Sequence, residues 1–211
     1  MAPLDDRRPQ RRKTPLTFQN LEPRLQLNAD VLGVDLALND SLSAGSDLLV
    51  RLFTETRDVD AGAQSVQRVE IVDRQAQEAD GVLAVRDLDA ITRIAIAGGA
   101  GDDLLTIDQA SFGATALPEF EFVGGDGFDS VALLANGDVT WSVVDQGGGF
   151  VETDESRADF AGVEALIGAA DNSDLFTISG DGWVEVVDGG EGGFDVLDTR
   201  QVQSQSIRYE A

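Results

Sequence analysis

Apolar and polar residues alternate in short runs along most of the chain. In the first half these runs cover residues 48–53, 66–72, 82–85 and 91–96. In the second half, β-prone runs cover residues 119–123, 139–146, 162–167 and 182–188, and a last one covers residues 202–209. Alternation with a period of two is typical of strands with one buried face. The pattern predicts an all-β protein, with helix expected only near residues 75–79 or 108–116.

A glycine-rich turn follows most of these runs. In the second half the turns begin at Gly98, Gly124, Gly147, Gly168 and Gly189, with spacings of 26, 23, 21 and 21 residues. Earlier turns at Gly45, Gly62, Gly81 and Gly98 are 17, 19 and 17 residues apart. Strand and turn repeated at such a period indicate a solenoid. The sequence therefore predicts a right-handed parallel β-solenoid over residues 31–211, with coils of about 17–26 residues, shorter in residues 31–97 and rich in Gly and Asp in residues 98–211.

The charge is unevenly distributed along the chain, whose net charge is −24. Residues 94–199 hold 22 Asp and Glu against one cation, Arg157, whereas five basic residues lie within residues 7–13. An acidic body repels nucleic acid and anionic lipid and attracts cations, divalent ones most strongly. The chain has no Cys and no His, which excludes disulfides, zinc–thiolate sites and histidine acid–base catalysis.

The first 20 residues contain three prolines and the basic cluster but no apolar run. We therefore expect residues 1–30 to form a disordered basic arm that ends in a short motif. The arm lacks the apolar stretch of a secretory or twin-arginine signal. No stretch of the chain approaches the roughly 18 apolar residues of a membrane span.

The motif at the end of the arm, residues 21–30, reads LEPRLQLNAD. It resembles the LEPR-XLL segment found near the N-terminus of very large, surface-associated bacterial repeat proteins. Gln26 and Asn28 depart from that segment, and the matching residues are Leu21, Glu22, Pro23, Arg24, Leu25, Leu27, Ala29 and Asp30. The resemblance implies an extracellular or cell-surface protein of a bacterium, exported by a route without a recognisable N-terminal signal peptide.

The turns at Gly98 and Gly124 share the formula Gly-Gly-x-Gly-x-Asp-x-apolar-x. This formula resembles the calcium-binding nonapeptide of RTX, or haemolysin-type, proteins. The resemblance implies Asp103 and Asp129 as side-chain ligands of Ca²⁺, and the residues that would offer carbonyl oxygens are Gly98, Ala100, Gly124 and Asp126. It extends to Asp195 if one inserted residue is allowed, and to Asp174 or Asp171 in the turn at Gly168.

The spacing of the turns differs from that family, whose repeats follow one another every nine residues. Because Ca²⁺ takes about six to eight oxygens, two turns must stack to complete a site, as successive coils of a solenoid would allow. Asp103 and Asp129 on neighbouring coils would repel each other, which calls for a bound cation, a raised pKa or splayed side chains. With one or two carboxylates per site, the expected affinity lies near 10⁻⁴–10⁻³ M, on the order of weak extracellular sites.

These features predict a structural or adhesive repeat region with weak Ca²⁺ sites and no enzymatic activity. Two alternatives stay open: a calcium-free structural solenoid, and a carbohydrate-active β-helix in which Arg157 faces paired carboxylates. Trp141, Trp183 and Phe128 would then offer a sugar-stacking surface instead of core packing. The expected partners are calcium, cell-surface polysaccharide, and other protein chains at the open last coil, with no nucleic acid and no membrane span.

Overall fold

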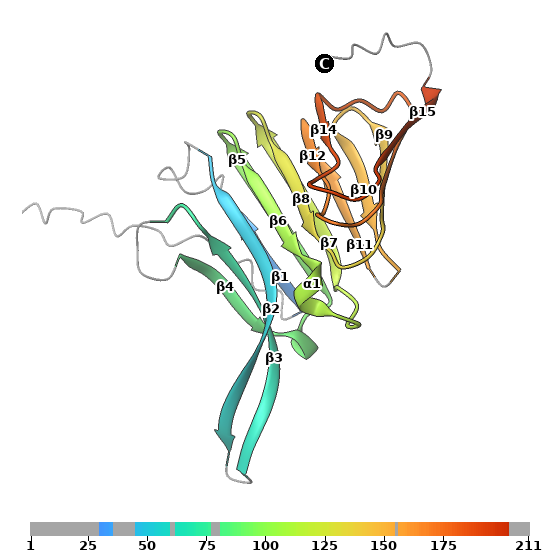
Figure 1. The fold of residues 1–211 in the computed structure, drawn as a ribbon. Coiled ribbons are helices and arrows are strands. Elements are labelled where there is room, and N and C mark those ends of the chain that lie inside the picture. The colour runs from blue at the N-terminus through green and yellow to red at the C-terminus, as the bar shows by residue number, and fades with distance from the viewer. Residues whose placement is uncertain (1–29, 36–44, 60–61, 77–80, 155, 203–211) are drawn as a thin grey trace, which may run out of the picture.

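The computed structural model describes residues 30–35, 45–59, 62–76, 81–154 and 156–202 (Figure 1). The predicted basic arm and all but the last residue of its LEPR-XLL-like motif lie outside these residues, as does most of the last predicted strand. The described chain is mostly β, as the alternation predicts. Its one α-helix, α1 (Gln109–Phe112), lies in one of the two places where helix was expected.

The strands form two sheets. The first sheet has eight strands in the order β1-β5-β7-β11-β10-β9-β13-β15. Their bounds are β1 (Val31–Asp35), β5 (Arg93–Ala100), β7 (Glu119–Asp126), β9 (Val139–Asp145), β10 (Gly148–Glu152), β11 (Arg157–Ala161), β13 (Asp174–Gly180) and β15 (Val196–Val202). The second sheet has seven strands in the order β14-β12-β8-β6-β2-β3-β4. Their bounds are β2 (Asp47–Val59), β3 (Gly62–Asp73), β4 (Val82–Asp87), β6 (Leu104–Asp108), β8 (Ser130–Leu134), β12 (Ala165–Ile167) and β14 (Val186–Asp188).

The middle of the chain passes from one sheet to the other through short turns. The turn after β5 leads into β6, and the turn after β7 leads into β8. β5 pairs with β7 in one sheet and β6 pairs with β8 in the other. Both pairs are parallel, and their registers match. Successive strand–turn–strand units therefore lie directly on one another, which places their turns side by side at one edge of the sheets.

The predicted right-handed parallel β-solenoid is wrong, because both sheets are mixed. β2, β3 and β4 are joined by antiparallel pairing, and β9, β10 and β11 form a second antiparallel group within the first sheet. Three of the glycines that were counted as corners of coils lie instead in reversals between antiparallel strands: Gly62, Gly81 and Gly147. All three have positive φ, a conformation that serves a hairpin as well as a coil. Glycine spacing alone could not separate the two.

The β2–β3 hairpin extends beyond the sheets as a two-stranded arm, which projects away from the other strands in Figure 1. β2 pairs with β6 only over residues 47–51, and β3 pairs with β4 only over residues 68–72, so residues 54–59 and 62–67 pair only with each other. Charged side chains hold the base of the arm. Arg57 donates to both oxygens of Asp87 at 2.8 and 2.9 Å, and Arg68 contacts Glu55 at 3.0 Å.

Apolar side chains from both sheets form one core. Trp141 is its largest fully buried residue and stacks on Phe176, with ring centroids 5.6 Å apart. Phe160 packs against the other side of Trp141 at a tilted angle. Trp141 is thus a core residue and offers no sugar-stacking surface. Within the described residues, no helix has the length and apolar character needed to cross a membrane.

The two tryptophans provide a test of this core. Replacing Trp141 by Ala removes a fully buried ring and should lower the free energy of unfolding by about 3–5 kcal/mol. Trp183 is 38% exposed, so Trp183→Ala should cost clearly less than Trp141→Ala. Urea denaturation followed by far-ultraviolet circular dichroism measures both changes. Equal losses in the two variants would contradict the described core.

Candidate functional site: the turn carboxylates

The two turns that match the calcium nonapeptide best lie against each other. Residues 98–103 form the end of β5 and the turn into β6, and residues 124–129 form the end of β7 and the turn into β8. Gly99 is paired with Gly125 and Ala100 with Asp126 in the register of the two strands. The backbone N–H of Gly101 donates to the carbonyl oxygen of Asp126 at 2.8 Å. The stacking that the sequence required of these two turns is therefore present, although the fold is not a solenoid.

The first glycine of each turn is required for space. A Cβ at Gly98 would lie 2.4 Å from Oδ2 of Asp103 and 2.5 Å from the carbonyl oxygen of Gly124. A Cβ at Gly124 would lie 2.4 Å from Oδ2 of Asp129 and 2.1 Å from the carbonyl oxygen of Gly162. These distances are below any normal contact, so only glycine fits. In both turns, the carboxylate and a carbonyl oxygen of the neighbouring turn converge on the missing side chain.

The glycines at the second and fourth positions of each turn allow its backbone conformation. Gly99 and Gly101 have φ of 100° and 102°, and Gly125 and Gly127 have φ of 123° and 141°. Other residues rarely adopt this region, so the turn chemistry predicted from the sequence holds at these four positions.

The carboxylates of the turns accept hydrogen bonds from the backbone of the neighbouring turn. The N–H of Ser46 donates to Oδ1 of Asp103 at 2.7 Å, and the N–H of Asp103 donates to Oδ1 of Asp129 at 2.9 Å. The N–H of Asp129 in turn donates to Oε2 of Glu164 at 2.8 Å. We call Ser46, Asp103, Asp129 and Glu164 the carboxylate column. It joins the turns before β2, β6, β8 and β12 across the edge of the second sheet.

Asp174 and Asp195 form a separate pair. The N–H of Asp174 donates to Oδ1 of Asp195 at 2.9 Å, so one carboxylate again binds the backbone of the neighbouring turn. Asp174 itself accepts from the N–H of Ala169 at 2.8 Å and from Nδ2 of Asn172 at 2.6 Å. Asp171 is the only described residue other than glycine with positive φ.

The two sets of turns lie at opposite ends of the strands of the second sheet. The turns of Asp103 and Asp129 precede β6 and β8, whereas the turns of Asp174 and Asp195 follow β12 and β14. These four strands are all parallel, so their first residues lie at one end of the strands and their last residues at the other end. The turns before β6 and β8 are therefore far from the turns after β12 and β14. The structure brings together Asp103 with Asp129 and Asp174 with Asp195, but it does not bring the four together.

Burial sets the electrostatics of the column. Asp103 is 1% exposed and Asp129 is fully buried. The pKa of Asp129 is raised to about 6, mainly by burial. The nearby carboxylates of Asp103 and Glu164 contribute to this rise, and the hydrogen bond from the Asp103 N–H opposes it. Burial also raises the pKa of Asp103, which the hydrogen bond from Ser46 opposes. The pKa of Asp174 is raised by burial as well.

One oxygen of each column aspartate is left without a partner. Oδ2 of Asp103 and Oδ2 of Asp129 are buried and accept no hydrogen bond from any described residue. A buried polar atom without a partner costs about 1–3 kcal/mol, which favours a proton or a cation at each of these two atoms.

The residues fit Ca²⁺ in part. An unpartnered carboxylate oxygen and a neighbouring carbonyl oxygen converge at each turn, which suits a cation. Ca²⁺ needs about six to eight oxygens, however, and Oδ1 of each aspartate already binds a backbone N–H. The carbonyl oxygen of Asp126, one of the predicted ligands, accepts from Gly101. Among the described residues, no three acidic, Cys or His side chains gather in a group that could hold a metal ion.

Two members of the column were not identified from the sequence. Ser46 contributes only its backbone N–H, which any residue other than proline could supply. Glu164 stands two residues after Gly162 in a turn that does not follow the nonapeptide formula. Its role follows only from the parallel pairing of β12 with β8. No local signal in the sequence could have pointed to either residue.

Arg157, the single cation of residues 94–199, does not lie in a cleft of the kind that a carbohydrate-active site would need. It lies on β11, where it pairs with Asp159 at 2.7 Å and Glu152 at 3.2 Å. Its guanidinium carbon also lies 3.7 Å from the ring centroid of Phe150. These contacts are on the strand surface, so the paired carboxylates that would support a carbohydrate-active site do not face Arg157 across a cleft.

Comparison of the chain with protein-family models, curated proteins and solved structures gives no significant match. The site is therefore interpreted from its own geometry.

Gly124 and Gly137 provide a matched pair of glycines. Gly124→Ala places a methyl group against the Gly162 carbonyl and the Asp129 carboxylate, and it should lower the free energy of unfolding by about 1–3 kcal/mol or more. A Cβ at Gly137 meets no atom within 4 Å, and the φ of Gly137 is not left-handed, so Gly137→Ala should be nearly neutral. Thermal denaturation of both variants checks this. An unaffected Gly124→Ala variant would contradict the packed column.

The raised pKa of Asp129 predicts a specific pH dependence. Below about pH 4 Asp129 is protonated in both states. As pH rises from there through about 6, the unfolded chain loses this proton first, so the wild type loses stability. Asp129→Asn keeps an oxygen for the Asp103 N–H but cannot ionise, so it should lack this loss.

Urea denaturation at pH 4, 5, 6 and 7 measures the effect. The stability of the Asn variant relative to the wild type should increase with pH. Asp126→Asn removes a charge from an exposed position of the same turn and serves as the control. A constant difference between Asp129→Asn and wild type would show that Asp129 titrates normally.

Proposed function

We propose that the chain is a structural and adhesive module, without enzymatic activity, of a secreted or surface-associated bacterial protein. The carboxylate column is the observation that carries the structural part. Its acidic side chains, the most distinctive of the sequence, bind the backbone of neighbouring turns, so their main role is to hold the fold together. The LEPR-XLL-like motif supports the bacterial surface as the location.

The carboxylates of the column take the place of the strand partners that backbone N–H groups in the turns lack. Backbone N–H groups at the edge of a sheet, where strands turn, have no strand partner and must be satisfied by other groups. Here a carboxylate from the next turn accepts the N–H of Ser46, Asp103 and Asp129 in succession. Hydrogen bonds to a charged acceptor contribute about 1.5–3 kcal/mol each, more than neutral ones. The column thereby fixes the stacking of the turns without a ligand.

Weak calcium binding at the same turns is a second candidate, and it rests on the unpartnered Oδ2 atoms. Asp103 and Asp129 would hold the ion together with carbonyl oxygens of Gly98, Ala100 or Gly124. A bound cation would offset the repulsion of these two buried carboxylates, and it would tie adjacent turns together. At the other end of the strands of the second sheet, Asp174 and Asp195 are the corresponding aspartates.

Association with other protein chains stays a prediction, and the last strands support it. Six of the larger exposed apolar side chains lie between residues 175 and 197: Leu175, Trp183, Val186, Phe194, Val196 and Leu197. Phe194 is 75% exposed. In the described residues, β14 and β15 are the outermost strands at this end of both sheets, so each has a free edge.

Thermal melting in EDTA and in millimolar Ca²⁺ separates the structural role from calcium binding. For a structural module held by the carboxylate column, the melting temperature of the wild type is the same in both. If Ca²⁺ binds, the melting temperature rises with its concentration, because a ligand of the folded state stabilises it by RT ln(1 + [L]/Kd).

Two controls complete this experiment. Mg²⁺ at the same concentration separates binding at the turns from general screening of the acidic surface. The double variant Asp103→Asn/Asp129→Asn should lose any Ca²⁺-dependent rise. A wild type that folds only in Ca²⁺ would contradict the column as sufficient support, and a wild type with no rise would remove calcium from the proposal.

A further inference from the structure

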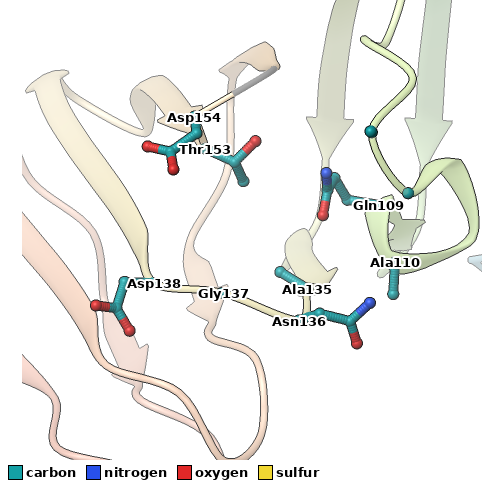
Figure 2. A pocket seen from close by; sticks show the side chains of 10 residues that line it. Gln109, Ala110, Ala135, Asn136, Gly137, Asp138, Thr153 and Asp154 are labelled. Atoms are coloured by element: carbon teal, nitrogen blue, oxygen red, sulfur yellow. The ribbon is translucent and has the colours of Figure 1, made fainter.

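A groove opens on the side of the molecule away from the carboxylate column. Three segments that are distant in sequence line it: α1 and the residues after it, the loop from β8 to β9, and the loop from β10 to β11. Figure 2 shows these segments around the opening. The groove has a volume of about 480 Å³, within the range of small-molecule sites.

Small residues leave its walls open. Ala110, Gly113, Ala114, Ala135 and Gly137 all line the groove, and a Cβ at Gly113 or Gly137 would meet no atom within 4 Å. Backbone and short side chains at these positions let a ligand approach the polar groups that lie between them. In Figure 2, Thr153 and Asp154 lie across the opening from Ala135 and Asn136, with Gln109 to one side.

Two polar residues of the lining carry a side-chain group that makes no hydrogen bond to another described residue. Gln109 is 6% exposed, and its side-chain amide makes no hydrogen bond to another described residue. Oγ1 of Thr153 is fully buried and likewise has no partner in the described part of the chain. Leaving the Thr153 hydroxyl unpaired costs about 1–3 kcal/mol, but this atom has no accessible surface that a ligand could reach. A ligand in the groove would instead meet the amide of Gln109, which favours a partner that both donates and accepts hydrogen bonds.

The charge of the lining limits the class of ligand. Asp138 and Asp154 are exposed in the groove, and no Lys or Arg is among the lining residues. Asp138 accepts the N–H of Ser173 through one oxygen at 3.1 Å. Phosphates, nucleic acids and uronic-acid polymers would be repelled. The groove is also larger than a single cation with its ligands at about 2.3–2.6 Å would need.

The chemistry that remains is that of neighbouring hydroxyl groups. Amide and carboxylate side chains offer donors and acceptors that match hydroxyls, each of which does both. A peptide would need a free strand edge or apolar pockets for its side chains, and the lining supplies neither. We propose that the groove between α1, the β8–β9 loop and the β10–β11 loop binds a short segment of an uncharged oligosaccharide. This proposal gives the adhesive part of the proposed function a ligand and rests on it, but it does not depend on the carboxylate column.

The test uses the whole chain and defined probes. Cellotetraose, xylotetraose and tetra-N-acetylchitotetraose are neutral probes, and tetragalacturonic acid is the anionic one. Two-dimensional amide NMR follows binding up to about 10 mM, because a polar groove without a stacking aromatic ring binds weakly. At least one neutral probe should shift amides of residues 109–114, 135–138 and 153–154 together, and the anionic probe should not.

Variants locate the binding. Gly137→Phe places a ring in the groove without a left-handed φ to strain it, and it should weaken binding at least about tenfold. Val144→Phe adds the same ring at an exposed position outside the groove and should have no effect. Asp154→Asn should change the affinity, whereas Asp181→Asn, an exposed aspartate outside the lining, should not.

Several results would overturn the proposal. These are no binding by any neutral probe, preferential binding of tetragalacturonic acid, or equal binding by Gly137→Phe and Val144→Phe. Unchanged melting temperatures of the groove variants show that they fold. Failure here with an intact carboxylate column would leave the structural role in place, whereas failure of the column would appear in the melting experiments instead.

Discussion

The hydrogen bond from a backbone N–H to a buried carboxylate is the interaction on which the stacking of the turns depends. Ser46, Asp103 and Asp129 each donate such a bond to the next turn, over 2.7–2.9 Å. The first glycine of each nonapeptide turn exists for the same bond, since any side chain there would displace the carboxylate. The same hydrogen bond thus requires the glycine in each turn and fixes the register of the neighbouring strands.

This constraint changes the interpretation of the nonapeptide-like turns. In the sequence, their aspartates resemble calcium ligands. In the structure, one oxygen of each aspartate holds the neighbouring backbone and the other is buried without a partner. The first oxygen explains the residue without a metal, and the second leaves a defined position for a proton or a cation. The same turn can therefore serve a ligand-free fold and keep the oxygen atom on which the proposed weak calcium binding rests.

The sequence predicts the strands well and their pairing poorly. Period-two alternation locates β2, β3 and β4, because a buried face leaves a local signature in each strand. The direction of pairing has no such signature: Gly62 and Gly147 close hairpins, whereas Gly98 and Gly124 lead from one sheet to the other. Asp103 and Asp129 could be identified because a nine-residue pattern surrounds them. Glu164 and the groove residue Gln109 could not, because their neighbours in space are distant in sequence.

The arm formed by β2 and β3 has a mechanical consequence. β2 is a single strand of 13 residues, and its far end lies in the arm while its near end follows Ser46, the first member of the carboxylate column. A load applied to the arm would pass along this strand to the hydrogen bond between Ser46 and Asp103. Because such a pull is directed along β2, it would shear the bonds between β2 and β6 together instead of opening them one by one. The force that the arm can bear is therefore set by the bonds between β2 and β6 and by the hydrogen bond from Ser46 to Asp103.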